Sequence, residues 1–567
     1  MEPTLSLSDL YAALRQARPV WGLGVETPLI QWRHVELVLE AAVHTPALAR
    51  TAAGMLSWAW QQRPLVPVFT ETLPSLAPYL AQADPKLPAF AKILARSLAA
   101  PQGPSPLADQ AAMPDPDAVL RAFSPLLKDQ TYGLYRLGEG FDMLLSLGGM
   151  DQTKELLDLA EHQGLPSQIL ARLRAEWALA ALLPDRPDQA RPIIEAVDPV
   201  LFPWWREYAL ARLELASGLH KQAKDRLIQL WRAMPWHTNL SLTLHDLLHP
   251  VPPDPAALER HKVAVLLYSW NKGEVLAQTL DSLAASNIGP ARVFVLDNGS
   301  TDSTPDLLQR TFEQWESLRP GSLYIETLPV NVGAPAARNW LLSLDKVKEC
   351  GYAAFLDDDL LLPEDWLVRL LSAAETSPQA GAVGCMVTDH IAPFSLQAAD
   401  FHLLHPDTPA ASFADSAEHV HVLQNATGSR DHTLFAYTRP CLSVTGCCHL
   451  VSMRAIEQAG AFDVRFTPSQ FDDLERDMRS CLASMPTLYT GALQVKHMQH
   501  SSLKQADSPA KTAHIFANKA KLEAKYAHED LLKLHEWNLG VVWEDLLGKV
   551  KKLEADVNVV EGKGKPF

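Results

Sequence analysis

Cysteine is sparse in this sequence, and its spacing argues against two classes of protein. Six cysteines occur in 567 residues. They show neither the rhythm of a disulfide framework nor the paired CxxC spacing of a metal-binding module. We therefore expect reduced cysteines in the core of a cytoplasmic protein. They are Cys350, Cys385, Cys441, Cys447, Cys448 and Cys481.

The chain also has no long hydrophobic run and no net positive charge. No window approaches the ~18 uninterrupted apolar residues of a membrane span. The opening MEPTLSLSDL has no basic stretch followed by an apolar one, so no signal peptide is predicted. The formal net charge is −16, which argues against nucleic acid or an anionic membrane as the main partner.

The composition is that of a folded protein with several domains. Hydrophobic residues make up 47% of the chain and charged residues 20%, which is enough for sizeable cores. The length suggests about three or four domains. We place a helical region at residues 1–125, helical hairpins at 126–250, an α/β domain at 258–502 and a helical tail at 503–567.

The first half is rich in Ala, Leu and Trp at helical spacing. The segments PDQARPIIEAV and HKQAKDRLIQL place Ala190 and Ala223 33 residues apart, close to the ~34-residue tetratricopeptide period. Gly218 and Pro235 flank the second copy in keeping with that pattern. This region resembles a short tetratricopeptide array, and generic antiparallel helical hairpins are the alternative.

Strand-like and helix-like segments alternate from residue 261 onward. The runs HKVAVLLYSW, ARVFVLDNGS, SLYIETLPV and GYAAFLDDD are strand-like, with helical stretches between them. This alternation predicts a mostly parallel sheet with helices on both faces.

Polar residues collect where these strands end. The four runs are followed by SWNKG, DNGSTD, NVGAPAARN and DDD, and ligands of such sheets bind outside the carboxyl ends of the strands. Neither GxGxxG nor GxxxxGK[ST] occurs at these turns, so the phosphates of a nucleotide would need another partner. A divalent cation held by carboxylates is the obvious one.

Three aspartates follow the fourth strand-like run. Asp357 and Asp359 share a face because alternate side chains of a strand point the same way. They can hold Mg²⁺ or Mn²⁺, with Asp358 turned toward another polar group. Without a cation the carboxylates would raise one another's pKa. The alternative is a helix N-cap, a position that Asp favours.

Seven motifs follow one another between residue 261 and about 500. They are VAVLLYSWNKGEVLAQTLDSL, VFVLDNGSTDST, NVGAPAARNWLL, AAFLDDDLLLPEDWL, AIEQAGAFDVRF, FDDLERDMR and VKHMQHSS. In this order they resemble the motifs of family 2 glycosyltransferases, which are inverting enzymes with a GT-A fold. The resemblance implies a Rossmann-like α/β catalytic domain with a mostly parallel sheet, after an all-α region and before the helical tail.

The resemblance implies a nucleotide-sugar site in the loops after the strands. Asp297 would accept a hydrogen bond from the base, which favours the uracil of a UDP-sugar, and Arg338 would lie near the diphosphate or the sugar. The alternatives are that Asp297 only forms a turn and that Arg338 is a surface residue. The full expected set is Ser269, Trp270, Asn271, Asp297, Asn298, Asn331, Gly333, Arg338 and Asp358.

The same resemblance implies a metal site that includes a histidine. Asp359, helped by Asp357 in a DXD arrangement, would hold the metal together with His497, and His500 is the second choice. A histidine ligand would favour Mn²⁺ over Mg²⁺. The alternative is that His497 is a partly buried histidine with a structural role.

Inverting transfer needs a carboxylate that takes the proton of the acceptor hydroxyl. In QFDDLERDMR, Asp472 and Asp473 match the acidic pair of the family. We expect Asp473 to be the base and Asp472 to bind the acceptor. Glu475 and Asp477 compete for the role, and an acidic first turn favoured by the helix dipole is the alternative.

These residues predict transfer of a single sugar from a nucleotide donor to an acceptor hydroxyl. The QxxRW motif of processive synthases is absent. The helical half could hold a protein acceptor, such as a bacterial surface or flagellar protein, since helical repeats build concave binding surfaces. A glycan or lipid-linked precursor is the alternative acceptor. A helical scaffold with an inactive transferase domain is the alternative function, although the intact aspartates argue against it.

Overall fold

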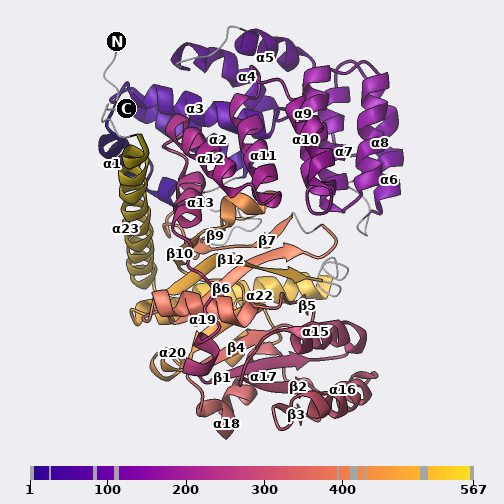
Figure 1. The fold of residues 1–567 in the computed structure, drawn as a ribbon, viewed down its shortest axis with the longest axis vertical. Coiled ribbons are helices and arrows are strands. Elements are labelled where there is room, and N and C mark those ends of the chain that lie inside the picture. Colours follow the sequence, from indigo (N-terminus) through magenta and orange to yellow (C-terminus); the bar gives the residue numbers. More distant parts are fainter. Residues whose placement is uncertain are drawn as a thin grey trace. The chain divides into compact units, whose positions relative to one another are not determined.

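The computed structural model describes residues 5–24, 27–80, 86–107, 114–392, 395–408, 419–426, 429–498 and 509–561. The chain forms two compact units. The helical unit comprises Met1–Leu248 and Leu546–Phe567, and the sheet unit comprises His249–Asp545. Figure 1 shows their elements in sequence colours. The four domains expected from the sequence stay a prediction beside this division.

The described part of the first 248 residues contains only helices and connecting loops. They are α1 (Leu7–Ala17), η1 (Pro19–Leu23), α2 (Pro28–Ala42), α3 (Leu48–Gln62), α4 (Pro67–Leu76), η2 (Ala77–Tyr79), α5 (Lys86–Arg96), α6 (Pro116–Phe123), η3 (Ser124–Lys128), α7 (Gly133–Ser146), α8 (Met150–His162), α9 (Ser167–Ala181), α10 (Pro187–Glu195), α11 (Pro203–Ala216), α12 (His220–Ala233) and α13 (Thr238–Leu248).

From α7 to α13 each helix packs on the next one along the chain. The two alanines that define the repeat offset, Ala190 on α10 and Ala223 on α12, are both fully buried. Small side chains at these points allow neighbouring helices to approach closely. The helical hairpins are thus observed, and their assignment as tetratricopeptide repeats stays a prediction.

The sheet unit alternates strands and helices. Its elements are α14 (Ala257–Arg260), β1 (Val263–Ser269), α15 (Gly273–Ala285), β2 (Arg292–Asp297), α16 (Thr304–Leu318), β3 (Leu323–Thr327), α17 (Ala334–Ser343), α18 (Asp345–Lys348), β4 (Tyr352–Leu356), β5 (Leu360–Leu361), α19 (Trp366–Thr376), β6 (Ala382–Asp389), β7 (Leu396–Ala398), β8 (Phe401–Leu403), β9 (Val422–Gln424), η4 (His432–Phe435), β10 (Thr438–Cys441), β11 (Cys448–Ser452), α20 (Met453–Ala459), η5 (Val464–Phe466), α21 (Asp472–Leu482), β12 (Thr487–His497), α22 (Pro509–Lys525) and α23 (His528–Glu561).

The main sheet has the strand order β10-β12-β6-β11-β4-β1-β2-β3. Strands β4, β1, β2 and β3 run parallel to one another. Strand β11 is antiparallel to both β4 and β6. The sheet is therefore mixed, with the predicted parallel half on one side of β11.

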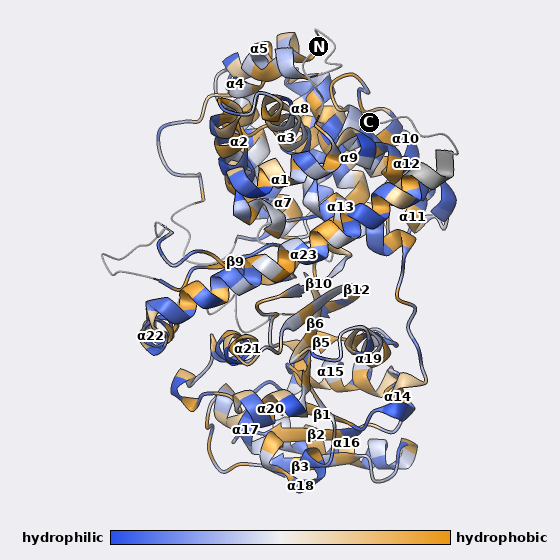
Figure 2. Ribbon diagram, turned by 90° about the vertical axis from the view of Figure 1, so that its left-hand side faces the viewer, coloured by the Kyte–Doolittle hydropathy of each residue, from blue (hydrophilic) through white to orange (hydrophobic). Residues whose placement is uncertain are grey.

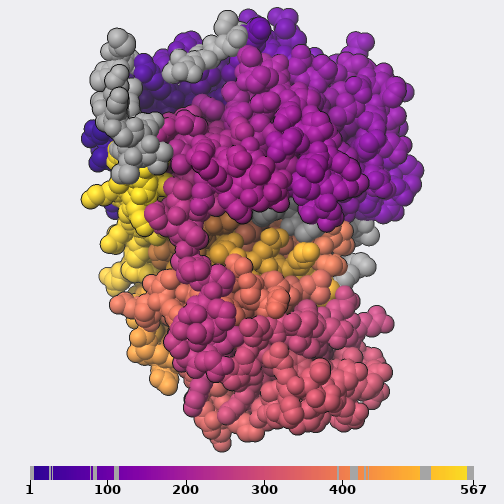
Figure 3. Space-filling view, in the orientation of Figure 1, coloured from indigo at the N-terminus to yellow at the C-terminus, as the bar shows by residue number. Residues whose placement is uncertain are grey.

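Both faces of the parallel half are buried, because alternate residues of β1 enter different cores. Val265 and Leu267 pack under helices α15, α16 and α19, whereas Leu266 packs under α17 and α18. The central strands are accordingly hydrophobic along their length (Figure 2). Figure 3 draws with all atoms the surface that α15, α16 and α19 present on one side of the sheet unit.

The predicted tail forms two helices in its described part. Helix α22 and the first turns of α23 share a core with α21, to which Leu522, Leu531 and Leu534 contribute. Helix α23 then continues into the residues that belong to the helical unit. Within the described ranges, no helix has both the length and the apolar content needed to cross a bilayer.

Candidate active site

The carboxyl ends of the parallel strands bring three predicted loops together. Ser269, the last residue of β1, lies opposite Asp297, the last residue of β2. On the other side of β1, Leu267 lies opposite Leu356, directly before the three aspartates. The site is therefore set by strand register, which holds the ends of β1, β2 and β4 at one edge of the sheet.

The three aspartates form a turn between β4 and β5 rather than a helix cap. The backbone N–H of Asp357 donates to the Cys447 carbonyl at 2.8 Å. After the turn, Leu360 pairs with His497 of β12, and α19 begins only at Trp366. The N-cap alternative is therefore wrong, because strand pairing separates the aspartates from the next helix.

Asp358 points away from its two neighbours, as the alternation of side chains predicts. Its carboxylate accepts a hydrogen bond from the Ser269 hydroxyl at 2.6 Å and one from the Lys272 ammonium at 2.7 Å. The side chain is 6% exposed. Burial raises its pKa, and the charge of Lys272 opposes that shift.

Asp357, Asp359 and His497 form a cluster whose ligand atoms all lie within 4.8 Å of one another. The pairing of β5 with β12 places the His497 ring 2.8 Å from the Asp359 carboxylate. The second ring nitrogen lies 2.9 Å from the Gln397 side-chain oxygen. Two carboxylates and an oriented imidazole are ligands that suit a divalent cation.

The two carboxylates of this cluster have pKa values shifted in opposite directions. Burial raises the pKa of Asp357 to about 6. Burial also acts to raise the pKa of Asp359, but the contacts with His497 and Lys272 outweigh it and lower that pKa to about 2. Although burial disfavours a charged imidazole, the hydrogen bond with Asp359 raises the pKa of His497. The hydrogen bond between the two side chains thus favours the charged forms of both Asp359 and His497.

Arg338 connects this cluster to the predicted acidic pair. Its guanidinium lies 3.5 Å from the Asp357 carboxylate and donates a 2.5 Å hydrogen bond to Asp472. Arg338 is only 5% exposed, so the surface alternative is wrong. Although burial disfavours its charge, the surrounding anionic groups raise its pKa.

Asp473 lies in the first turn of α21, beside Arg338 and Asp472. Its carboxylate accepts a hydrogen bond from the Gly446 backbone N–H at 2.7 Å. A Cβ at Gly446 would come within 2.9 Å of that carboxylate and 3.1 Å of Arg338. Gly446 therefore lets the loop before β11 lie directly against both side chains.

The remaining predicted residues form the loops around this centre. The Asp297 carboxylate accepts a hydrogen bond from Ser300 N–H at 3.0 Å, so the turn role considered for it does occur. The Asn298 amide donates to Asn331 at 3.0 Å, and Asn331 accepts from Gly333 N–H at 2.8 Å. These contacts connect the loops after β2 and β3.

The rim of the site is more exposed. Trp270 is 48% exposed, and the neighbouring Asn271 side chain accepts a hydrogen bond from Thr301 N–H at 2.7 Å. Asn271 adopts φ 53°, a left-handed conformation that Asn tolerates better than most residues. His500, the second histidine considered, lies outside the described residues.

Sequence reasoning missed Lys272, which contacts two of the three aspartates. Its ammonium lies 2.7 Å from Asp358 and 3.3 Å from Asp359. Burial acts to lower its pKa, but these carboxylates outweigh that effect and raise it. A lysine next to the SWN stretch was visible in the sequence, but its 86-residue separation from Asp358 hid the contact.

The fold and the acidic centre at the strand ends define an α/β glycosyltransferase domain of the GT-A type. Residues 264–458 match the model of the family described as Glycosyl transferase family 2. The chain thus contains a family 2 glycosyltransferase domain, and the resemblance inferred from its motifs is confirmed.

Two curated relatives show sequence similarity to this chain. The succinoglycan biosynthesis protein ExoM of Rhizobium meliloti is 35% identical over 140 residues, which cover 23% of this chain and 41% of the relative. A Mycobacterium tuberculosis N-acetylglucosaminyl-diphospho-decaprenol L-rhamnosyltransferase is 24% identical over 271 residues, which cover 45% of this chain and 80% of the relative. The chain thus spans less than half the length of the first of them.

Two solved structures are also similar. A Pyrobaculum calidifontis mannosyltransferase in complex with GDP-Man and Mn²⁺ shares 17% identity at a TM-score of 0.35, and the match covers 62% of this chain and 88% of the other. GalNAc-T7 with UDP, GalNAc and Mn²⁺ shares 12% identity at a TM-score of 0.33, and the match covers 49% and 53%.

Proposed function

We propose that this protein is a metal-dependent inverting glycosyltransferase that moves one sugar from a nucleotide donor, a UDP-sugar, to an acceptor hydroxyl. One observation supports this most directly. The buried guanidinium of Arg338 lies between the Asp357, Asp359 and His497 cluster and the Asp472–Asp473 pair. A cation site and a candidate base thus flank one fixed positive charge at the edge of the sheet.

The ligand set of the cluster fits a divalent cation. Asp357, Asp359 and His497 would hold Mn²⁺ or Mg²⁺, and their ligand atoms already converge. The bound ion would supply positive charge that stabilises the leaving diphosphate. Arg338 would add a guanidinium suited to phosphate oxygens or to the sugar.

Asp473 would act as the base. In a single in-line displacement, the acceptor oxygen bonds to the anomeric carbon and the bond from that carbon to the diphosphate oxygen breaks. The proton of the acceptor hydroxyl passes to the Asp473 carboxylate. The Gly446 N–H bond fixes the orientation of this carboxylate, while Asp472, held by Arg338, would position the acceptor.

The loops after β1 and β2 would bind the nucleotide. Exposed Trp270 offers an aromatic face to the base, and Ser269 would line the same pocket. Asp297 would accept a hydrogen bond from uracil through the carboxylate oxygen that does not accept from Ser300 N–H. Asn271, Asn298, Asn331 and Gly333 would shape these loops around the ribose and the phosphates.

The acceptor is either a protein bound by the helical unit or a lipid-linked glycan. The consecutive packing of α7 to α13 supports a binding surface for a protein. The name of the mycobacterial relative, which describes a lipid-linked acceptor, supports the second choice. Incubation of the enzyme and a labelled donor with a lysate, followed by separate protein and lipid extraction, would show which fraction takes the label.

A screen of nucleotide sugars with Mn²⁺ tests the proposal through release of the nucleotide. We expect one donor to be hydrolysed or transferred, and Asp359→Ala to abolish both this activity and metal-dependent nucleotide binding. Asp281→Ala, at an exposed position of α15, is the matched control and should behave like the unaltered protein. Absence of any turnover, together with no thermal shift on addition of UDP and Mn²⁺, would contradict the proposed transferase activity.

A further inference from the structure

The helical unit contains a cavity that the transferase chemistry does not use. It measures about 30 Å³ when traced by the centre of a water molecule, which is room for a few atoms. It lies among η1, α2, α3 and the start of α13. The residues that matter most for its chemistry are Trp21, His34, Met55, Trp58, Trp236 and Asn239.

Aromatic rings form most of its wall. The Trp21 ring meets the His34 ring edge to face with centroids 5.0 Å apart, and lies 6.1 Å from the Trp236 ring. Trp236 packs directly on α3, because a Cβ at Gly54 would come within 3.1 Å of its indole nitrogen. The cavity thus has rigid, flat and largely apolar sides.

Several buried polar atoms at this cavity have no hydrogen-bond partner among the described residues. They are the indole nitrogens of Trp21 and Trp58, Nε2 of His34, and both polar side-chain atoms of Asn239. These side chains are 8%, 3%, 2% and 0% exposed, respectively. Buried polar atoms in folded proteins are almost always paired with protein groups or ordered water. Five such atoms around one cavity therefore point to a polar occupant.

Four of the five atoms are nitrogen donors. Arg18 donates to Nδ1 of His34 at 3.3 Å, so the neutral ring carries its proton on Nε2. Burial and the nearby Arg18 charge lower the pKa of His34 to about 3, which keeps the ring neutral. These five atoms thus offer N–H groups from two indoles, one imidazole and one amide, and one acceptor, Oδ1 of Asn239.

We propose that this cavity binds a carboxamide group. The carbonyl oxygen of the group would accept from the N–H donors, and its own N–H would donate to Oδ1 of Asn239. The attached carbon would pack on the indole faces and Met55. A carboxylate fits less well, because the described residues that line the cavity include no Lys or Arg and an unpaired buried charge is costly.

Two sources carry this chemistry: the acetamido group of an N-acetylated sugar, and the side-chain amide of Asn or Gln in a peptide. Both place a short carboxamide on a larger body that could remain outside the cavity. The inference stands apart from the proposed transferase activity, because it rests only on residues of the helical unit.

Saturation-transfer-difference NMR on the full chain tests the proposal with acetamide as the probe. For a ligand of so few atoms we expect a Kd in the millimolar range, so the titration extends to tens of millimolar. The acetamide methyl signal should appear with the unaltered protein, and acetate should bind at least about tenfold more weakly. Asn239→Leu should remove the signal, and Trp58→Phe, which keeps an aromatic side chain but loses the indole N–H donor, should weaken binding at least about threefold.

The matched control is Trp60→Phe. Trp60 lies on the same helix α3, but its indole N–H donates to Thr70 at 3.2 Å, so this substitution should leave acetamide binding unchanged. Circular dichroism establishes that each variant is folded. If Asn239→Leu does not fold, Trp58→Phe against Trp60→Phe decides the question.

Competition identifies the source. Displacement of acetamide by N-acetylglucosamine but not by glucosamine would support a sugar, and displacement by a Gln-containing peptide but not by its Glu counterpart would support a protein side chain. Failure of both larger probes would reject both sources and leave only a small carboxamide. The proposal is overturned if acetamide gives no signal with the unaltered protein. It is also overturned if Trp58→Phe and Asn239→Leu both give the same signal as the unaltered protein. The polar atoms would then bind ordered water only.

Discussion

Lys272 lies between Asp358 and Asp359, where its positive charge offsets two carboxylates of the site. Its ammonium forms ion pairs with both carboxylates. A lysine so close to a proposed cation site repels the ion and at the same time relieves repulsion among the aspartates when no ion is present. This residue therefore sets how strongly the acidic centre depends on a metal.

Replacing Lys272 with Met should make the protein more dependent on a divalent cation. We expect a lower melting temperature in the presence of a chelator, because buried carboxylates lose their partner. Removing the opposing charge should tighten Mn²⁺ binding by about tenfold. Calorimetric titration with Mn²⁺ measures the affinity, and Lys272→Arg serves as the charge-preserving control. Unchanged Mn²⁺ affinity in Lys272→Met would show that the ion binds elsewhere.

Asp473→Asn should abolish transfer while leaving UDP binding nearly intact. The amide keeps the shape of the side chain but cannot take a proton, so we expect a loss of about 10²- to 10⁴-fold in turnover. Initial rates and a UDP titration measure the two effects separately. Glu475→Gln is the comparison, since Glu475 is buried and paired with Lys525. Normal transfer by Asp473→Asn would assign the base to another residue.

At this scale the sequence predicted the acidic residues better than their partners. Asp357 and Asp359 were placed on one face by strand alternation alone, and the structure brings their oxygens together. The contact from Gly446 to Asp473 could not be predicted in that way, because it depends on how the loop before β11 folds over α21. Local spacing fixes which side chains share a face, whereas such contacts depend on tertiary packing.

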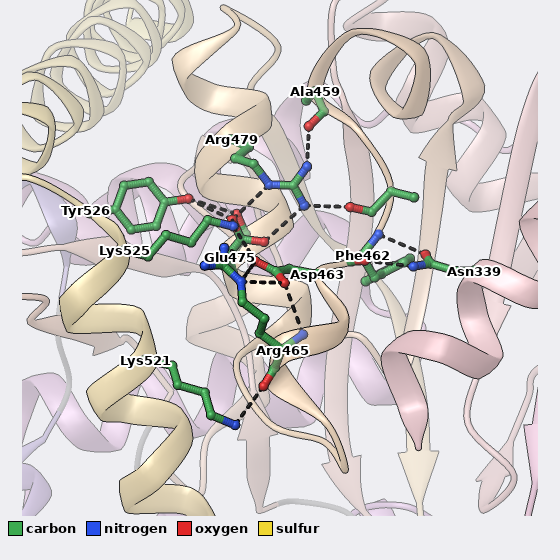
Figure 4. Close-up of polar contacts among 11 residues, drawn as sticks. Asn339, Ala459, Phe462, Asp463, Arg465, Glu475, Arg479, Lys521, Lys525 and Tyr526 are labelled. Carbon is green, nitrogen blue, oxygen red and sulfur yellow. Dashed lines mark hydrogen bonds and ion pairs between the residues drawn. The ribbon is translucent and has the colours of Figure 1, made fainter. Parts of the chain in front are cut away.

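Helix α22 of the tail anchors the helix that carries the acidic pair. Lys525 forms ion pairs with Asp463 at 2.7 Å and with Glu475 of α21 at 2.5 Å, and the Tyr526 hydroxyl donates to Glu475 at 3.0 Å (Figure 4). Arg479 holds the same Glu475 at 2.8 Å and donates to the Ala461 carbonyl at 2.6 Å. The start of α21 is therefore fixed from two sides.

Lys525→Met should loosen α21 and lower kcat without a matching change in UDP affinity. Glu475 is fully buried, so loss of one cation leaves its charge less well compensated. Misplacement of Asp473 should reduce kcat by about tenfold, with UDP affinity within about twofold of the unaltered value. Steady-state kinetics with a UDP titration measure this split.

The matched control for this prediction is Lys521→Met. Lys521 lies one turn earlier on α22 and donates to the Arg465 carbonyl and to Asn518, so it does not touch α21. It should change kcat little, and Lys525→Arg should restore most of the activity. Equal losses in both methionine variants would mean that α22 acts on overall stability rather than on the position of α21.

The alternation of strands and helices in the sequence predicted the parallel half of the sheet. The arrangement of the other half could not be predicted from the sequence. Strands β1, β2, β3 and β4 occur where apolar runs end in polar loops. The antiparallel insertion of β11 between β4 and β6 leaves no comparable mark, because strand order depends on which edges meet in space. The short strands β8 and β9 likewise have no periodic pattern long enough to predict.

At the scale of the whole molecule, one helix supplies residues to both units. The first part of α23 belongs to the sheet unit, where Asn538 accepts from Leu403 N–H at 3.0 Å. The residues from Leu546 onward belong to the helical unit, and Leu546, Val550, Leu553 and Val557 are buried there. The boundary between the units therefore falls inside a regular helix, a place that composition does not reveal.

A fragment of residues 249–545 should fold and bind UDP with Mn²⁺ at an affinity within a few-fold of the full chain, because every residue of the proposed donor site lies in the sheet unit. A fragment of residues 249–561 is the matched control. It should be less soluble, since the apolar side chains after residue 545 would lose their cover. Thermal shift with UDP and light scattering measure the two properties. A folded 249–545 fragment that fails to bind UDP would contradict this division of labour.

The composition of the helical unit has a consequence for how the chain folds during synthesis. Its first 248 residues are synthesised before the sheet unit, but the segment Leu546–Phe567 that completes the helical unit is synthesised after it. About 300 residues separate the two, which at ordinary translation speeds amounts to roughly 15–60 s. Throughout that interval the apolar surface on which Leu546 and Leu553 pack is exposed to solvent and accessible to chaperones. The helical unit thus begins to be synthesised before the sheet unit but is completed after it.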